Sequence, residues 1–320
     1  MNIVVFGKDG QLGKAFQALL ATKLPALTNA LNIRYVGRSE CDLSDAAGLT
    51  GLLKQLQPDL IINASAYTAV DKAETELELA FAINAKAPEI MAAFAAEHGA
   101  TFLHYSTDYV FDGEKYGFYL ENDVRNPLSA YGKSKAAGEE AIAKVFAGSG
   151  GNGQYAIFRT SWVYGEGGNF IRTILRLAKE REQLKVIHDQ YGVPTNASWL
   201  AQVSLDLAVD ENLRVKKFPS GIYHAVPAGE TTWHGLASVA VQAALEAGAL
   251  LKLAPNDIKP IPALEYPLPA PRPMNSRMST GKLRHILELQ GDMSKLQQLS
   301  QSWELGVKAY VARLAQDGLI

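Results

Sequence analysis

Short, unbroken runs of β-branched and aromatic residues recur along this chain and constrain its fold more than any other feature. They lie at 2–6, 33–37, 59–65, 101–106, 155–161, 184–189 and 221–226. Helical stretches separate the early runs, at 11–22, 45–57, 83–98 and 131–147. Unbroken apolar runs are typical of strands that are buried on both faces of a parallel sheet. The alternation therefore predicts an α/β fold with a doubly wound parallel sheet of the Rossmann type.

The pattern changes after about residue 165. Helical stretches at 169–180, 196–210 and 233–248 are spaced less regularly, and residues 255–273 hold seven of the fourteen prolines. So many prolines exclude a long helix or a central strand, and they favour an ordered loop or a sheet edge. We expect a dinucleotide-binding domain over 1–165, which residues near 191–226 rejoin. Residues 166–190 and 227–320 are expected to form mainly a smaller, mixed substrate-binding lobe.

The bulk composition excludes several classes of function. Net charge is −2, and no stretch is basic enough to indicate binding to nucleic acid or to an anionic membrane surface. Cys41 is the single cysteine, so no intramolecular disulfide can form, which suits a reducing compartment. No signal peptide and no apolar run of the roughly 20 residues needed to cross a bilayer is recognisable. We expect a soluble, cytoplasmic protein.

Three glycines lie between the first predicted strand and the first predicted helix. Gly7, Gly10 and Gly13 enclose Gln11 and Leu12 in the spacing G-x-x-G-x-x-G. Glycine permits a tight turn and a close approach of backbone to a pyrophosphate, and the helix N-terminus offers free N–H groups. The spacing differs from G-x-G-x-x-G, but its place between strand and helix predicts dinucleotide binding.

The end of the second predicted strand bears on the choice of cofactor. NADH-binding chains usually have an acidic residue there, whereas this chain has Gly37 and Arg38. An arginine can pair with a 2′-phosphate, so we expect NADPH to be preferred, with NADH possible. The alternative is that Arg38 is a solvated surface residue. Asp42 and Leu43 are candidates to frame the adenine, although Asp42 could instead cap the helix that begins near Asp45.

A tyrosine and a lysine stand four residues apart on a predicted helix. Tyr131 and Lys135 therefore share one face, within reach of one substrate. A neighbouring ammonium lowers the pKa of a phenol, which would make Tyr131 a usable general acid for a carbonyl oxygen. Such a pair by itself can also be an ordinary feature of a helix surface.

The glycine spacing, then Thr107, then Tyr131 with Lys135, resembles the extended short-chain dehydrogenase/reductase family in residue types and order. Within that family, further blocks resemble the reductases of 4-keto sugar nucleotides. These blocks are 63–74, 106–113, 131–135, 158–165, 189–195, 272–278 and 303–308.

The resemblance implies an oxidoreductase of dTDP-rhamnose biosynthesis. Its reaction would be the NAD(P)H-dependent reduction of the C4 ketone of dTDP-4-dehydro-6-deoxy-L-mannose to dTDP-L-rhamnose. In this interpretation Tyr131 delivers the proton. Lys135 lowers the pKa of Tyr131 and holds the cofactor ribose, and Thr107 orients the carbonyl.

The resemblance also implies ligand contacts at the ends of later strands and in the lobe. Cofactor contacts are expected at Asn63, Ala64, Ala66, Tyr67 and Thr68. Substrate contacts are expected at Asp108 for a sugar hydroxyl, at Trp162 for the sugar, and at Arg272 and Asn275 for the diphosphate and nucleotide. As alternatives, Trp162 is a core aromatic residue, and Arg272 and Asn275 are surface residues. Asn84 either braces the sheet or caps a helix.

Two other functions remain open at this point. The first is a sugar-nucleotide epimerase or dehydratase, but dehydratases of the family have glutamate after the aspartate, where this chain has Tyr109. The second is a non-catalytic partner that resembles the regulatory subunit of methionine adenosyltransferase.

Metal binding and dimerisation are also considered through the resemblance. The six histidines have no metal-ligand spacing. Some relatives are associated with Mg²⁺ at a carboxylate-lined dimer contact. Lys14 and Ala15 stand where such relatives have an acidic residue, so no metal site is predicted. A homodimer is possible.

Overall fold

A six-stranded parallel sheet forms the centre of the computed structural model, which describes residues 1–23, 31–291 and 293–320. The strand order is β10-β5-β4-β3-β1-β2. The bounds are β1 (Asn2–Phe6), β2 (Asn32–Val36), β3 (Leu60–Asn63), β4 (Thr101–Thr107), β5 (Gln154–Thr160) and β10 (Gly221–His224). The doubly wound parallel sheet predicted from the unbroken apolar runs is confirmed.

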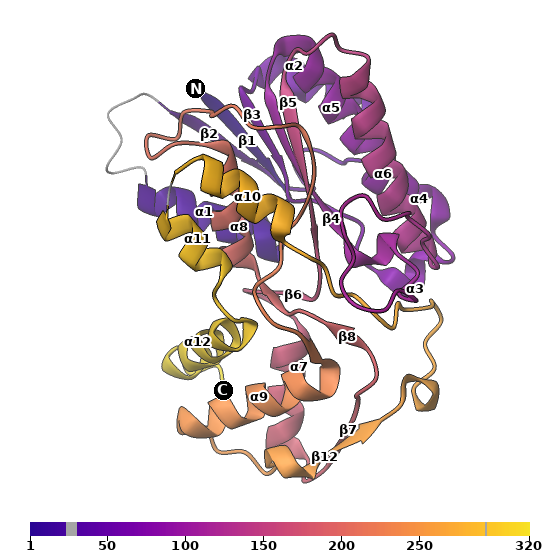
Figure 1. Cartoon of the computed structure of the whole chain (residues 1–320), viewed down its shortest axis with the longest axis vertical. Helices are drawn as coiled ribbons and strands as arrows, with labels where there is room; N and C mark the ends of the chain where they lie inside the picture. The colour runs from indigo at the N-terminus through magenta and orange to yellow at the C-terminus, as the bar shows by residue number, and fades with distance from the viewer. Residues whose placement is uncertain (24–30, 292) are drawn as a thin grey trace.

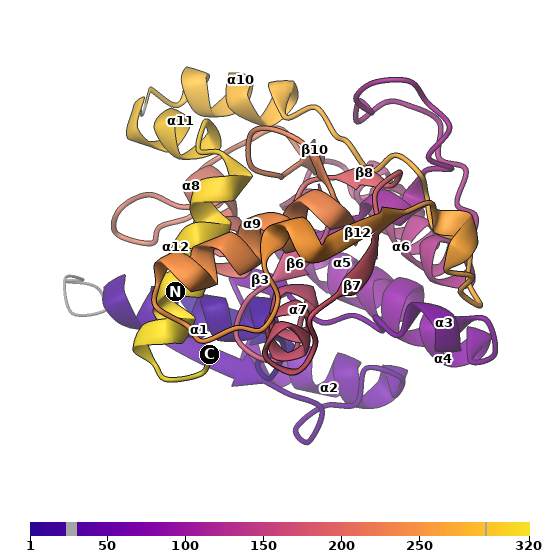
Figure 2. The same ribbon diagram turned by 90° about the horizontal axis from the view of Figure 1, so that it is seen from below.

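Helices cover both faces of this sheet, as Figure 1 shows. One face carries α1 (Gln11–Lys23), α8 (Ala197–Ala208), α10 (Gly281–Leu289) and α11 (Met293–Leu299), and the other carries α2 (Ala46–Leu56), α5 (Ala87–His98) and α6 (Ala130–Ala147). Successive strand side chains point to opposite faces. Val5 accordingly packs in the same core as Phe16, and Val4 packs in the other core with Leu49. Figure 2 shows α10 and α11 on the opposite side of the molecule from α2.

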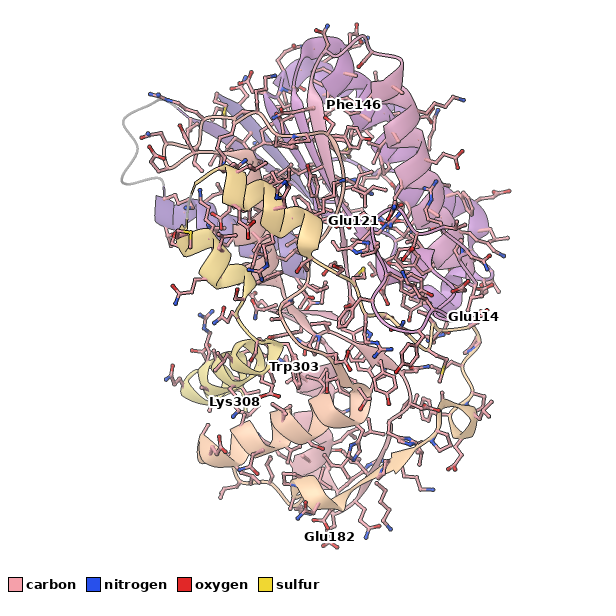
Figure 3. The ribbon with its side chains drawn as sticks, viewed as in Figure 1. Glu114, Glu121, Phe146, Glu182, Trp303 and Lys308 are labelled. Atoms are coloured by element: carbon pink, nitrogen blue, oxygen red, sulfur yellow. The ribbon has the colours of Figure 1, made fainter. Side chains whose placement is uncertain are left out.

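A smaller lobe lies beyond one end of the sheet. It contains α7 (Phe170–Glu180), α9 (Trp233–Glu246), α12 (Trp303–Gln316), and β7 (Leu184–Ile187) paired with β12 (Ile258–Ile261). The proline-rich segment thus supplies a short edge strand, as its composition predicts. Figure 3 shows Phe146 at the far end of the sheet and Glu182 at the opposite end of the molecule.

Short elements join the sheet to the lobe or support the helices. They are β6 (Val163–Tyr164), β8 (Tyr191–Gly192), β9 (Thr195–Asn196), β11 (Thr231–Thr232), α3 (Val70–Ala73), α4 (Leu77–Phe81), the π-helical turn Ala82–Lys86 and the 3₁₀ turns Asp108–Val110, Pro255–Asp257 and Ala263–Glu265. β6 pairs with β9, and β8 pairs with β11.

The chain crosses between sheet and lobe more than once. β10 pairs in the central sheet and α8 packs on its face, and both lie in the stretch near 191–226 that was expected to rejoin the dinucleotide-binding domain. The helices α10 and α11, which fall in the range that was grouped with the lobe, pack on the sheet because Leu283, Leu287 and Leu299 belong to the same core as α8. The exact division into two domains stays a prediction.

One helical stretch among the described residues, Leu77–His98, is long and apolar enough to pass a length-and-composition test for a membrane span. Half of its apolar window is buried inside the protein, and core helices of soluble proteins pass the same test. Within it, Met91, Ala92 and Ala95 pack against the sheet, so this stretch serves the core.

Substituting Gly138 on α6, with Gly51 on α2 as a control, tests how closely α6 packs. A Cβ at Gly138 would lie 2.1 Å from the Asn84 carbonyl oxygen, whereas one at Gly51 would meet no described atom within 4 Å. We expect Gly138→Ala to lower the free energy of unfolding by about 1–3 kcal/mol through overpacking. Gly51→Ala should raise it by about 0.5–1 kcal/mol, because alanine is the better helix former. Urea unfolding measures both, and equal effects would contradict the packing argument.

Candidate active site

The carboxyl ends of β1 and β3 meet backbone to backbone. From β1 the chain runs to β2 on one side of the sheet and then to β3 on the other, and ligands bind at such a switch point. Gly7 has φ 82°, and a Cβ there would lie 2.8 Å from the Ala64 carbonyl. A Cβ at Gly13 would lie 2.0 Å from the Gly7 oxygen. Gly10 is less constrained, with its nearest atom at 3.4 Å.

This glycine turn suits a dinucleotide pyrophosphate. The turn leads into α1, whose first N–H groups are free to bind an anion. The Gln11 side-chain oxygen is buried and lacks a hydrogen-bond partner among the described residues, so it is available to a ligand. Leu12 differs, since it packs in the core beneath the turn. The N–H groups of Gly7 and Gly10 are bonded to Val36 O and Gly7 O, so these two glycines would give the cofactor room, and the N–H groups at the start of α1, Gly13 among them, would bind its pyrophosphate.

At the end of β2, the Arg38 side chain is 81% exposed and lies 4.0 Å from Asp42. Asp42 accepts hydrogen bonds from the backbone and hydroxyl of Ser44, whereas Asp45 caps α2. Asp42 is therefore not the helix cap. Leu43 packs, half-buried, against the core on the α2 side.

Sequence reasoning missed a second cation beside Arg38. Lys8 pairs with Glu40, which also accepts a 2.9 Å hydrogen bond from Gly37 N. The Lys8 hydrogen bond and then the Gly37 N–H lower the pKa of Glu40 to about 2. The cations Lys8 and Arg38 and the anchored carboxylate of Glu40 thus lie at the end of β2. This is the position that was expected to determine whether NADPH or NADH is preferred.

The loop after β3 carries Ala64, Ala66, Tyr67 and Thr68, all at least partly exposed. Asn84 holds this loop, because its amide oxygen accepts from Tyr67 N at 2.9 Å and its amide nitrogen donates to Tyr67 O at 3.0 Å. The same nitrogen donates to the Ser134 hydroxyl on α6. Of the two alternatives for Asn84, the structure supports bracing.

The helix α6 places Tyr131 and Lys135 one turn apart against β4. Ser129 caps the helix by accepting a hydrogen bond from Gly132 N. Lys135 is 1% exposed, and its Nζ lies 2.5 Å from the Tyr105 carbonyl oxygen and 3.3 Å from His104 Nε2. Burial lowers the pKa of Lys135 to about 8, and this shift is opposed by the charge of Glu139.

Tyr131 does not show the pKa depression that the sequence analysis expected. Desolvation raises its pKa, the negative charge of Asp108 adds to the rise, and a hydrogen bond with Thr107 offsets part of it. Lys135 has its described contacts with the Tyr105 carbonyl and His104 instead. The phenol therefore keeps its proton at neutral pH, which still suits a general acid.

The segment after β4 forms an internal hydrogen-bond network. The Thr107 hydroxyl donates to Asp108 at 2.8 Å and accepts from Tyr109 N at 3.2 Å. Asp108 is 2% exposed and also accepts from the Ser276 hydroxyl. Burial raises the pKa of Asp108 to about 6. The Tyr109 ring packs edge-on against Tyr131 with centroids 5.4 Å apart. The expected residues Thr107, Asp108 and Tyr131 are thus brought together.

Trp162 stacks on a partner that the sequence analysis did not identify. Its ring lies 3.8 Å from that of Trp233, and its backbone has the left-handed φ of 48°. A Cβ at Gly192 would lie 2.6 Å from the Trp162 indole, so the position facing this ring must lack a side chain. Trp162 is half-buried and strained, which is common at functional sites.

Arg272 and Asn275, which were expected to bind the substrate, already form hydrogen bonds within the protein. Arg272 makes two hydrogen bonds to Asp71, at 2.7 and 2.8 Å, and it also affects Tyr109 electrostatically. Asn275 is 5% exposed and donates to the carbonyls of Lys115 and Gly117. Arg272 therefore lies near the Tyr109–Tyr131 pair, whereas Asn275 fixes a loop. No local spacing reveals Asp71 or Ser276, because their partners lie 201 and 168 residues away.

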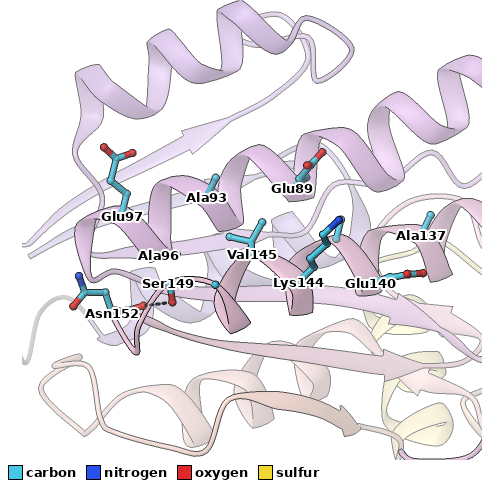
Figure 4. A pocket seen from close by; sticks show the side chains of 12 residues that line it. Glu89, Ala93, Ala96, Glu97, Ala137, Glu140, Lys144, Val145, Ser149 and Asn152 are labelled. Atoms are coloured by element: carbon cyan, nitrogen blue, oxygen red, sulfur yellow. Dashed lines mark hydrogen bonds between the residues drawn. The ribbon is translucent and has the colours of Figure 1, made fainter.

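A separate hollow lies between α5 and α6, and Figure 4 shows Ala93, Glu97 and Lys144 around it. It contains none of the residues expected to bind cofactor or substrate. Within the described ranges, no group of three or more His, Cys, Asp or Glu side chains has a metal-binding arrangement.

Comparison with known proteins gives a consistent family. The sequence profile described as RmlD substrate binding domain matches residues 1–315. A dTDP-4-dehydrorhamnose reductase of Salmonella typhimurium is 42% identical over 316 residues, covering 98% of each chain. A crystal structure of such a reductase from Clostridium acetobutylicum has a TM-score of 0.82 at 32% identity, covering 98% of this chain and 99% of that one.

A second solved structure, from Bacillus anthracis, is a dTDP-4-dehydrorhamnose reductase in complex with NADP. Its TM-score is 0.80 at 30% identity, and the match covers 98% of this chain and 99% of that one. These similarities extend over nearly the full length of the chain. The chain therefore belongs to the RmlD substrate binding domain family, the family of the dTDP-4-dehydrorhamnose reductases.

Proposed function

We propose that this protein reduces the C4 ketone of dTDP-4-dehydro-6-deoxy-L-mannose to give dTDP-L-rhamnose, the last step of dTDP-rhamnose biosynthesis. The observation that carries the proposal is the grouping of Thr107, Tyr131 and Lys135 at the carboxyl end of β4, with only β3 between β4 and β1, the strand that leads into the glycine turn. The reductases to which the chain is similar bear this activity in their names. The related NADP complex supports a nicotinamide cofactor.

The roles of the residues follow from their protonation states and contacts. Bound NADPH would supply the hydride to C4. Tyr131 donates its phenolic proton to the C4 oxygen, since its raised pKa keeps the phenol protonated. Thr107 turns its hydroxyl from Asp108 to the same oxygen and stabilises the developing charge. Lys135, when charged, binds the cofactor ribose and stabilises the Tyr131 phenolate that proton transfer leaves behind.

The lobe would complete the substrate site. Arg272 would exchange Asp71 for a substrate phosphate, because both are oxygen anions that match a guanidinium. Trp162, supported by Trp233, would present a ring face to the sugar. Asp108 would bind a sugar hydroxyl in place of Ser276.

The alternatives lack the same support. Elimination by a dehydratase needs a second acid–base group after Asp108, and Tyr109 stands there. A non-catalytic partner would not need the assembled Thr107, Tyr131 and Lys135. We infer a cytoplasmic enzyme that binds a nucleotide sugar, and a homodimer stays a prediction. Lys14, which stands where relatives associated with Mg²⁺ have an acidic residue, pairs with Glu166 at 2.6 Å.

Replacing the proposed acid tests the reaction. We expect Tyr131→Phe to lower kcat by about 10²–10⁴-fold, because the C4 oxygen loses its proton donor. The measurement is loss of NADPH absorbance with the 4-keto sugar nucleotide generated in place. Tyr155→Phe is the matched control, as Tyr155 is another half-buried tyrosine that packs on Phe146. Wild-type protein that binds NADPH but oxidises neither NADPH nor NADH would refute the reductase proposal.

The pH dependence of kcat/KM for NADPH should follow the ionisation of Lys135 and not that of Tyr131. Lys135 loses its charge as pH rises through its pKa of about 8, so kcat/KM for NADPH should fall over that range. Arginine keeps its charge there, so Lys135→Arg should lose this alkaline decline even if its rate is lower. A decline that persists unchanged in Lys135→Arg would assign it to another group.

Arg38 is expected to discriminate between the cofactors. Because a guanidinium pairs with a 2′-phosphate that NADH lacks, Arg38→Ala should raise the KM for NADPH about tenfold and leave that for NADH nearly unchanged. Arg34→Ala, on the exposed side of β2, is the control. Equal losses with both cofactors would show that Arg38 does not contact the 2′-phosphate.

A further inference from the structure

A buried histidine lies directly behind the proposed catalytic lysine. His104, on β4, is 0% exposed, and its ring lies between β3 and α6. Its Nδ1 is 3.1 Å from the Asn63 amide nitrogen, and its Nε2 is 3.3 Å from Lys135 Nζ. The proposed mechanism assigns nothing to this side chain.

The position of its proton follows from the neighbouring groups. The Asn63 amide oxygen accepts a 3.2 Å hydrogen bond from Ser65 N, so the amide nitrogen faces His104. An amide nitrogen is a donor, and Nδ1 must therefore be an unprotonated acceptor. Burial and the charge of Lys135 both lower the pKa of His104 well below its usual value, so the ring is neutral. Because the ring is neutral and its Nδ1 is unprotonated, the single ring proton is on Nε2.

That proton points at Lys135. An ammonium group has three donors and no acceptor, so an N–H aimed at it from 3.3 Å is unfavourable. A neutral amine has a lone pair and accepts the same N–H as a hydrogen bond. We propose that His104 is a positioning residue for the reduction, whose Nε2–H is aimed at Lys135 Nζ and, in addition to burial, favours the amine form of this lysine. The role in catalysis rests on the function proposed above.

The charged groups near Lys135 do not favour its amine form as His104 does. Glu139, one turn further along α6, favours the ammonium, but it is held by Arg159 at 2.7 and 2.9 Å and by Arg125 at 3.4 Å. Asp108 acts mainly on the Tyr131 and Tyr109 phenols. The Tyr105 carbonyl accepts from Nζ in either state.

The arrangement has a chemical use. A group whose pKa lies near the working pH can take up and release a proton at little cost. After Tyr131 gives its proton to the substrate, a proton must return to the phenolate. Ammonium Lys135 stabilises the phenolate through its charge until a proton from water forms the phenol O–H bond, and Lys135 can then release its own proton to water and return as the amine to its contact with Nε2–H.

The first test is the pH profile of His104→Gln. A glutamine amide can turn its oxygen toward Lys135 and accept from the ammonium, so the alkaline decline of kcat/KM for NADPH should move up by about one pH unit. His224→Gln is the matched control, because His224 is equally buried but lies on β10 beside Arg159. It should lose stability without moving the decline. A decline that stays in place in folded His104→Gln protein would overturn the proposal.

The second test does not need turnover. Nitrogen-15 NMR of histidine-labelled wild-type protein should show a neutral ring with its proton on Nε2 that disappears in His104→Gln and is thereby assigned to His104. A proton on Nδ1 of His104, or a charged ring at neutral pH, would overturn the proposal whatever the activity of the variant. If the wild type shows no reductase activity, the function fails, and an NMR titration of Lys135 in both proteins still decides the role of His104.

Discussion

The contact between the backbones of β1 and β3 at Gly7 and Ala64 is the constraint on which the rest of the site depends. Since a Cβ at Gly7 would overlap the Ala64 carbonyl, the two strand ends can meet only through glycine. Their approach places the first turn of α1 and the loop after β3 side by side. β4 pairs directly with β3, so the loop after β4 opens on the same edge of the sheet. The turn expected to bind the cofactor and the proposed proton donor therefore lie at one edge of the sheet.

Much of this could be predicted from the sequence because the signals are local. Unbroken apolar runs indicate strands buried on both faces, and the structure has them in one parallel sheet. Glycines between a strand and a helix indicate a phosphate turn, and Gly7 and Gly13 leave no room for side chains. Tyr131 and Lys135 share a face because the helical period requires it.

The rest depends on contacts that no local pattern encodes. Arg272 meets Asp71 and Ser276 meets Asp108 only after the chain has returned from the lobe. The pKa of Tyr131 was expected to fall because a lysine one turn away suggests a neighbouring charge. Burial outweighs that effect, since Lys135 is directed to the Tyr105 carbonyl and His104 and both groups lie in desolvated surroundings. Helical spacing gives proximity, but the protonation state depends on the tertiary environment.

The strained tryptophan has a consequence for how this family can vary. Trp162 keeps a left-handed backbone and a stacked ring because Gly192 presents no side chain to its indole. A larger residue at 192 would force the indole to move, and a different ring at 162 would remove the reason for glycine at 192. The two positions are therefore epistatic. We therefore expect a change at one of these positions to be tolerated only together with a change at the other, so that the surface around the Trp162 ring would change in coupled steps during evolution.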